Sequence, residues 1–340
     1  MTTRTSGPDA DGGTTAAGET AAEETAAGET VATLAAGTGR WLGLHAGRLD
    51  SPAGRAELPV TPRVKALLQL ALLCRCWRKA APDDLALEPV LAVVEHAWRR
   101  PDFPRLLARS PDSARPFGLI WAALAPAGAV TDARRGMLDR LCADGYLMPR
   151  RKSPYLHLGT RFYAELAGVG HELASYEELY ACSMLARADR VPVAELDVCQ
   201  VTDTVFYLSD YGFRDTGLDA EARERALRVV ERLTDHCVRE GAWEYAAKLL
   251  LARHCLGSDP LRTPSGTAAL GMLAGARSPD GSIPGKTARG RAPASAAPQQ
   301  YFRWAYQPTL VTALTTLLLT NGRHPHPVPT TAPPTARRTR

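Results

Sequence analysis

The segment TPRVKALLQLALLCRCW, residues 61–77, carries the pattern that decides the fold class. Its apolar residues, from Ala66 to Cys74, recur at the three- and four-residue spacing of a helix with one buried face. Thr61 and Pro62 precede them, and a capping residue followed by proline is typical of a helix's first turn. We therefore expect a long amphipathic helix in this segment.

The same periodicity recurs along the chain, in LEPVLAVVEHAW (87–98), ARRGMLDRLCADGYL (133–147), YEELYACSMLARA (176–188), AEARERALRVVERLTDHCV (220–238), WEYAAKLLLARHCLG (243–257) and YQPTLVTALTTLLL (306–319). Strand patterns are confined to YLMPRR (146–151) and PYLHLG (154–159), for which we expect a small hairpin. The sequence predicts an all-α protein of about ten to twelve helices. Helix pairs of that number stack as an open solenoid or as a closed α/α ring.

Both ends of the chain differ from this core in composition. Residues 1–30 repeat Ala, Gly, Glu and Thr with one base against six acids, and we expect a disordered acidic arm. Residues 323–340 form a basic, proline-rich tail that we also expect to be disordered. The remaining residues, 31–322, predict a single helical domain with a flexible basic loop at 277–300.

Charge and composition exclude several classes of protein. The net charge is +5, and the 41 basic residues include only five lysines, a bias typical of a GC-rich genome. The chain lacks the dense basic clusters with interleaved aromatics that nucleic-acid binding needs, so we expect no nucleic-acid partner. It also lacks an export signal and a membrane-length apolar run, which predicts a cytoplasmic protein with no membrane contact. Phosphate-binding and dinucleotide motifs are absent, and we expect no cofactor.

Three landmarks point to a resemblance. SPDGSIPGK followed by YFRWAYQPTLVTALTTLLL (278–286 and 301–319) resembles the loop-to-helix entry of α/α-toroid cyclases, the lanthionine-cyclase and terpenoid-cyclase-like toroids. GRWLGLHAGRLD (39–50) and CQVTDTVFYLSDYG (199–212) resemble motifs of an actinobacterial helical family that accompanies biosynthetic gene clusters. That family carries histidine where this chain has Asp203, and Tyr-His-Thr-Thr-Leu where it has Tyr306-Gln307-Pro308. The resemblance therefore implies a member with altered chemistry.

The leading candidate site lies on the segment 199–211. Asp203, Tyr207 and Asp210 repeat at helical spacing opposite an apolar stripe, so they are expected on one face. In a closed ring that face points into the central cavity, where two carboxylates and a phenol can act as general base, general acid and substrate clamp. The alternative is a solvent-exposed face of an ordinary amphipathic helix.

Two further segments contribute substrate-binding candidates. His254 and Cys255 end a helix, where adjacent histidine and cysteine raise the alternative of a zinc site; the spacing is poor for metal binding, and we predict none. Tyr306 and Gln307 precede Pro308 at an expected helix start and are placed at the cavity mouth, with Arg303 from the preceding basic loop.

The resemblance and the candidate face together predict a peptide-tailoring enzyme of a specialised-metabolite pathway, lanthionine-cyclase-like or accessory to one, that moves protons without a metal. The expected partner is a precursor peptide or a partner biosynthetic enzyme. The alternative is a non-catalytic helical adaptor that binds the same peptide or enzyme. A terpenoid-type cyclase is a third possibility, but an aromatic content of 6% makes its cavity lining hard to supply.

Overall fold

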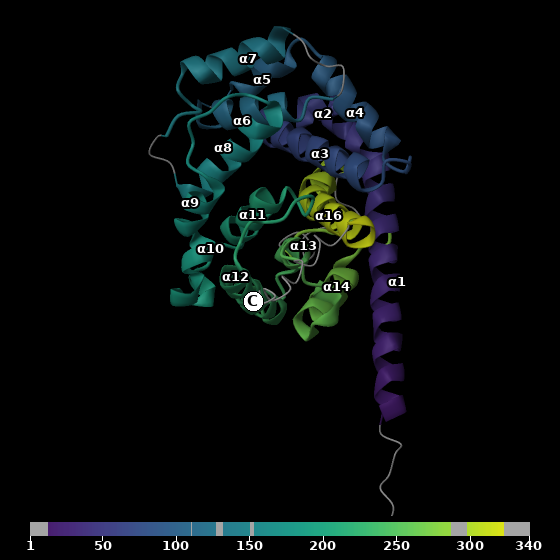
Figure 1. Ribbon diagram of the computed structural model, residues 1–340. Coiled ribbons are helices and arrows are strands. Elements are labelled where there is room, and N and C mark those ends of the chain that lie inside the picture. Colours follow the sequence, from purple (N-terminus) through teal and green to yellow (C-terminus); the bar gives the residue numbers. More distant parts are fainter. Residues whose placement is uncertain (1–12, 110, 127–131, 150–152, 287–297, 323–340) are drawn as a thin grey trace, which may run out of the picture.

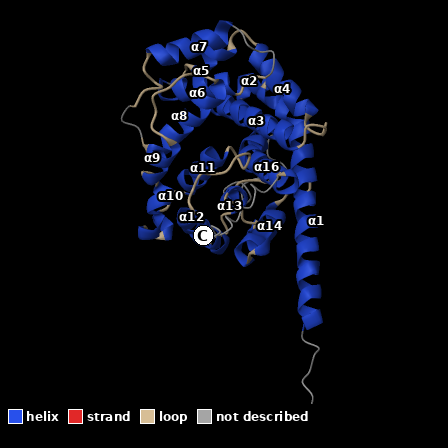
Figure 2. Ribbon diagram, in the orientation of Figure 1, coloured by secondary structure: helices blue, strands red, loops and turns tan. Residues whose placement is uncertain are grey.

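The computed structural model describes residues 13–109, 111–126, 132–149, 153–286 and 298–322. Every regular element in these ranges is a helix, and none is a strand (Figure 2). The all-α prediction is confirmed. The predicted hairpin is wrong, because PYLHLG forms the first turns of a helix that Ser153 caps by accepting a hydrogen bond from the Leu156 amide.

Six helices contact one another in a closed cycle, which we call the six-helix ring. In order around the ring they are α3 (Val60–Ala80), α6 (Pro111–Ala123), α8 (Pro154–Ala167), α11 (Val198–Ser209), α13 (Trp243–Cys255) and α16 (Pro298–Asn321), and α16 contacts α3 again. Their labels follow one another around the middle of Figure 1. An open solenoid keeps its first and last helices apart, whereas here the first and last helices of the cycle are in contact.

Four successive helices of the ring, α8, α11, α13 and α16, run in the same direction. In α11 and α13, Asp203 contacts Lys248, and later in both helices Ser209 hydrogen-bonds Cys255. Between α13 and α16, the Thr315 hydroxyl donates to the Ala247 carbonyl at 2.8 Å. Seven residues further along both segments, a Cβ on Gly322 would lie 2.6 Å from Nε2 of His254. Contacts that advance together in this way require parallel helices.

The helices α8 and α11 are parallel by the same test. Tyr155 hydrogen-bonds Asp203, and eight residues later in both segments Tyr163 hydrogen-bonds Tyr211. The amino-terminal ends of these ring helices therefore lie at the same end of the ring.

The other helices form an outer layer. They are α1 (Gly13–His45), α2 (Pro52–Glu57), α4 (Glu88–Arg99), α5 (Phe103–Leu107), α7 (Asp132–Ala143), α9 (Tyr176–Ala181), α10 (Met184–Arg187), α12 (Ala220–Arg239) and α14 (Pro264–Ala276). α4 packs on α3, α7 on α6, α9 on α8, α10 on α11, α12 and α14 on α13, and α1 on α16 (Figure 1). Each ring helix is thus covered on its outer side, which buries the apolar stripe that its sequence shows.

The amino-terminal arm is the clearest departure from expectation. Residues 13–30 were expected to be disordered, but they belong to α1. Alanine and glutamate are strong helix formers, and the later turns gain tertiary support because Ala27, Val31 and Leu34 are buried against a cluster that includes Leu273 of α14. Low hydrophobicity alone therefore did not decide the state of this segment. Residues 1–12 and the predicted tail 323–340 lie outside the described residues.

The first part of the predicted flexible loop is tightly packed. Pro308 lies inside α16 and has no amide hydrogen, so the Trp304 carbonyl lacks its usual helical donor; the Gly285 amide supplies one at 3.1 Å. The Ile283 amide donates to the Thr309 hydroxyl at 2.8 Å, and Ile283 is fully buried. Residues 278–286 are therefore fastened to α16, while 287–297 lie outside the described residues.

Gly281 marks the closest approach between this segment and α1. Its φ is +93°, and a Cβ there would lie 2.3 Å from the Gly37 carbonyl oxygen. Only glycine fits this combination of backbone angle and contact.

We expect Gly281→Ala to lower the free energy of unfolding by about 2–4 kcal/mol, because it adds a backbone clash to an unfavourable φ. Urea denaturation measures this. Gly271→Ala in α14 is the control, since a Cβ there meets nothing within 4 Å, and it should be neutral or stabilising by up to about 1 kcal/mol. Equal losses in the two variants would contradict the close approach.

Candidate functional site

The six-helix ring encloses a cavity of about 350 Å³. All six ring helices line it, and representative residues in ring order are Leu72, Phe117, Tyr163, Asp203, Lys248 and Leu314. Its volume falls at the lower end of the range of about 300–1,000 Å³ that is usual for small-molecule sites.

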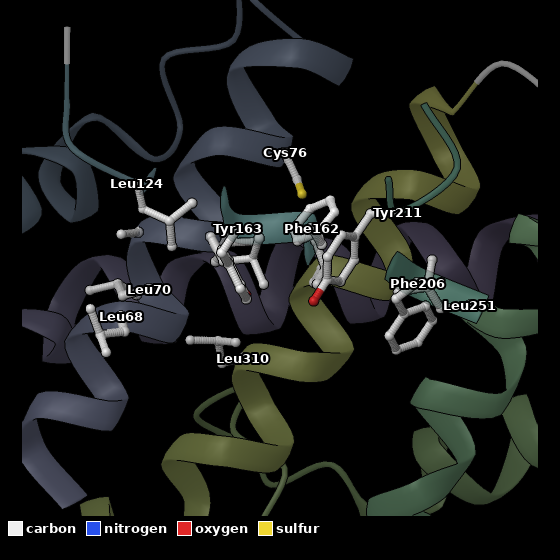
Figure 3. Close-up of a cluster of buried hydrophobic side chains, with 14 of the residues drawn as sticks. Leu68, Leu70, Cys76, Leu124, Phe162, Tyr163, Phe206, Tyr211, Leu251 and Leu310 are labelled. Carbon is white, nitrogen blue, oxygen red and sulfur yellow. The ribbon is translucent and has the colours of Figure 1, made fainter. Parts of the chain in front are cut away.

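The cavity has a polar end and an apolar end. In α11 the lining residue Asp203 precedes Phe206, and in α13 Lys248 precedes Leu251. Because these helices are parallel, the polar residues of their early turns meet at one end. Aromatic and aliphatic side chains occupy the other, where Figure 3 shows Phe206 and Leu251 among the buried side chains. A ligand with a polar group and an apolar body matches this polarity.

The polar end is organised around the carboxylate of Asp203. Lys248 Nζ lies 2.9 Å from Oδ1, and the Tyr155 hydroxyl donates to Oδ2 at 3.1 Å. The side chains of Lys248 and Asp203 are only 17% and 16% exposed. Burial opposes the charge on Lys248, but the Asp203 carboxylate and a hydrogen bond with Cys199 outweigh it and raise the pKa of the ammonium. Lys248 is therefore charged at neutral pH.

Cys199 stands beside this pair, in the first turn of α11 that Asp197 caps. Burial raises the pKa of its thiol, and the positive charge of Lys248 only partly opposes the rise. The side chain is thus a neutral thiol at pH 7 and not an activated nucleophile.

Tyr207 lines the cavity deeper than Asp203. Its ring lies against Phe162 and Tyr163 of α8, with centroids at 5.3 and 6.0 Å. A Cβ on Gly159 would lie 3.4 Å from the Tyr207 hydroxyl oxygen, so the small residue makes room for the phenol. Burial raises the pKa of Tyr207 well above its usual value, which keeps it a neutral hydrogen-bond donor.

Asp210 does not share this site, and its predicted catalytic placement is wrong. α11 ends at Ser209, and Asp210 adopts the left-handed conformation with φ 48° and ψ 47°, so helical spacing no longer governs its direction. Its carboxylate binds Arg75 and Lys79 of α3 at 2.7 and 2.8 Å. It fastens the end of α11 to α3 outside the lining of the cavity.

Of the two predicted residues Tyr306 and Gln307, only Gln307 lines the cavity. The Tyr306 hydroxyl donates to the Ala66 carbonyl at 2.8 Å and lies 3.2 Å from Gln69 Oε1, so it ties α16 to α3 instead of facing the cavity. Gln307 does line the cavity, as predicted. The expected helix start is wrong, because α16 begins at Pro298 and places Pro308 in its interior.

His254 and Arg303 lie away from the cavity lining. His254 is buried at the far end of α13, against Gly212 and Gly322. Arg303 is exposed on α16. Burial raises the pKa of the neighbouring Cys255 thiol to about 12, and no cluster of three or more metal-ligating side chains occurs in the described part of the chain. The zinc alternative therefore finds no ligand set among these residues.

Tyr155, Cys199 and Lys248 were missed by the sequence analysis. Tyr155 was placed in a hairpin, and Lys248 lies 45 residues from its partner Asp203. One signal was present in the composition, because lysine is rare in this chain and its positions are therefore informative.

A second cavity of about 240 Å³ adjoins the first and shares Cys199, Lys248 and Gln307 with it. The packed segment before residue 287 forms part of its wall through Gly285 and Lys286. The polar end of the ring therefore continues toward the surface beside this segment. Among the described helices, none has the length and apolar character to cross a membrane.

We expect Asp210→Asn to lower the free energy of unfolding by about 2–4 kcal/mol at pH 7, because it leaves two cations without their carboxylate. Burial opposes ionisation of Asp210, but Arg75 and Lys79 outweigh it and hold its pKa below 3.8. This stabilisation is present above the unfolded pKa and is lost as the pH falls through the folded one. Urea denaturation should show the two proteins converging below about pH 3.8.

Asp139→Asn, on the exposed face of α7, is the matched control and should leave stability unchanged within about 0.5 kcal/mol. A loss for Asp210→Asn that persists undiminished in acid would contradict the ion-pair explanation.

Comparison with known proteins identifies the family of this chain. No curated protein and no solved structure matches the chain. One family model matches residues 35–317, a span that runs from within α1 to within α16 and includes the whole cavity lining. The chain therefore belongs to the family described as a domain of unknown function, DUF6895.

Proposed function

We propose that this chain is a peptide-tailoring protein of a specialised-metabolite pathway, which holds one segment of a precursor peptide in the six-helix ring and transfers a proton there without a metal. The observation that supports it best is the 2.9 Å contact between Lys248 and Asp203 at the polar end of a cavity that six helices line. We further propose that the ring is a toroid of the lanthionine-cyclase-like kind and that the protein works in the cytoplasm.

The proposed reaction is the addition of a peptide thiol to a dehydrated residue of the same peptide. The thiol S–H bond breaks and its proton passes to Asp203, while sulfur bonds to the β-carbon of the alkene. The electron pair of the C=C bond moves toward the carbonyl, and the proton returns to the α-carbon. No electron is gained or lost, so the step needs no oxidant or reductant.

Each group at the polar end has a role in this scheme. Lys248 stabilises the negative charge that develops on the carbonyl oxygen, since a buried ammonium acts strongly in a site with little water. Asp203 is the base once the substrate displaces one of its hydrogen bonds. Tyr155 positions the carboxylate, and Tyr207 contributes a neutral phenol further down the cavity.

A specific observation favours a second candidate, the non-catalytic adaptor. Both oxygens of Asp203 are occupied, one by Lys248 and the other by Tyr155. A carboxylate held in this way is a weak base until one contact opens. In the adaptor the same cavity would bind the peptide and present it to a partner enzyme without chemistry of its own.

Asp203→Asn tests the choice between the two functions. For the enzyme, we expect the rate of product formation in a reconstituted pathway to fall by at least about 100-fold, the usual contribution of a general base. Tyr155→Phe, which removes only a positioning contact, should cost about tenfold. Mass spectrometry of the peptide product measures both rates.

Asp235→Asn is the matched control, because Asp235 is exposed on α12, and it should react at the wild-type rate. If Asp203→Asn also forms product at that rate, proton transfer by this carboxylate is refuted and the adaptor function takes its place.

A further inference from the structure

Lysine is distributed unevenly in this molecule. The chain has 41 basic residues, of which only Lys65, Lys79, Lys152, Lys248 and Lys286 are lysine. Lys65 and Lys248 line the ring cavity, and Lys248 and Lys286 line the cavity that adjoins it. Among the residues that the structure describes, no arginine lines either of these cavities. With arginine so dominant elsewhere, chance placement would put arginine at such positions.

The two side chains differ in what they can bind. Arginine presents a planar fork of donors, whereas lysine presents a compact charge on a flexible stem. A compact ammonium can hold a single carboxylate inside a narrow cavity without the flat space that a guanidinium needs. The choice of lysine is therefore informative about the ligand.

The charges at the polar end do not balance. Three lysines face two acids, Asp203 and Glu244, across the joined cavities. Lys248 is neutralised by Asp203 at 2.9 Å. The backbone amide of Lys286 donates to Glu244 Oε2 at 3.2 Å, and its side-chain ammonium donates to the Glu240 carbonyl. Neither Lys65 nor Lys286 has an ion pair within 4.0 Å among the described residues, but the Lys286 ammonium has the Glu240 carbonyl as a partner, whereas the Lys65 ammonium has no hydrogen-bond partner there.

Lys65 is exposed, so it lies at the opening of the cavity, before the buried residues of α3 that line the interior. It precedes Leu68, Gln69 and Leu72 on the same face of α3, and all four line the cavity. The Gln69 side chain is held by Tyr306, so Lys65 is followed by an ordered amide and then by leucine. A ligand whose negative group binds Lys65 can therefore extend its other atoms into the apolar part of the cavity.

We infer that Lys65 binds the free carboxylate of a peptide that enters the cavity. The peptide's apolar residues next to that carboxylate lie toward the apolar end of the cavity. This inference rests on the proposed function and adds the chemical class of the segment that enters, a carboxyl-terminal apolar peptide. Lys248 remains with Asp203 and does not supply the charge for the carboxylate.

Binding of two dansylated dipeptides tests the inference without turnover. Dansyl-Leu-Leu with a free carboxyl terminus should bind the wild-type protein about five- to tenfold more tightly than its carboxamide, as a charge-assisted hydrogen bond predicts. Fluorescence titration gives both dissociation constants. Equal affinities for the acid and the amide would overturn the inference.

Two variants of Lys65 and one control variant test whether Lys65 causes the preference for the acid over the amide. Lys65→Gln should bring the acid to the affinity of the amide, and Lys65→Arg, which keeps the charge, should restore part of the preference. Arg187→Gln removes a charge from the exposed face of α10 and should bind both probes like the wild type. Loss of the preference in Arg187→Gln, or its persistence in Lys65→Gln, would contradict the assignment.

A competition experiment distinguishes a peptide carboxylate from a fatty acid as the ligand of the cavity. Acetyl-Leu-Leu should displace the probe at lower concentration than dodecanoate; the reverse order would overturn the peptide as occupant. Asp203→Asn keeps Lys65 and should retain the acid preference. If that variant prefers the acid and still forms product at the wild-type rate, the proposed chemistry fails while the binding inference stands.

Discussion

The ring closes where its first helix meets its last. Tyr306 of α16 donates its phenolic hydrogen to the carbonyl of Ala66 in α3, across 240 positions of the chain. The same hydroxyl lies 3.2 Å from the Gln69 side chain that lines the cavity. Closing so long a segment costs chain entropy, and the ordered helices between the two residues supply the contacts that offset it. The contact between α3 and α16 joins two of the helices that line the cavity.

Residues 278–286, which precede α16 in the sequence, are held in place by that helix. Proline in a helix interior leaves one carbonyl without its donor, and here the amide of Gly285 takes that place. The Trp243 indole donates to the Pro284 carbonyl at 2.8 Å, so the segment is held from α13 as well. What the sequence presents as a flexible proline- and glycine-rich loop is therefore, up to residue 286, a wall of the second cavity.

Local pattern predicted the helices and three residues of the cavity lining, Asp203, Tyr207 and Gln307, but not the partners of Asp203. Periodicity placed Asp203 on a face opposite the apolar stripe, and the structure puts that face in the cavity. Periodicity failed at Asp210, because two successive residues with positive φ, Asp210 and Tyr211, end the helix and turn the chain. Lys248 could not be paired with Asp203, because their contact depends on how α11 and α13 pack. The helix over residues 13–30 was missed because alanine-rich repeats favour helix without showing an apolar stripe.

The common direction of α8, α11, α13 and α16 has an electrostatic consequence of its own. Each helix carries a macrodipole equivalent to about half a positive charge at its amino terminus, worth roughly 0.3–1 kcal/mol to a nearby anion. Tyr155 and Cys199 lie in the first turns of α8 and α11, so the positive ends of these dipoles point into the polar end of the cavity. The negative, carboxyl-terminal ends of these helices lie toward the apolar end of the cavity. The backbone itself thus gives the cavity a field along its axis, and side-chain substitutions leave that field in place.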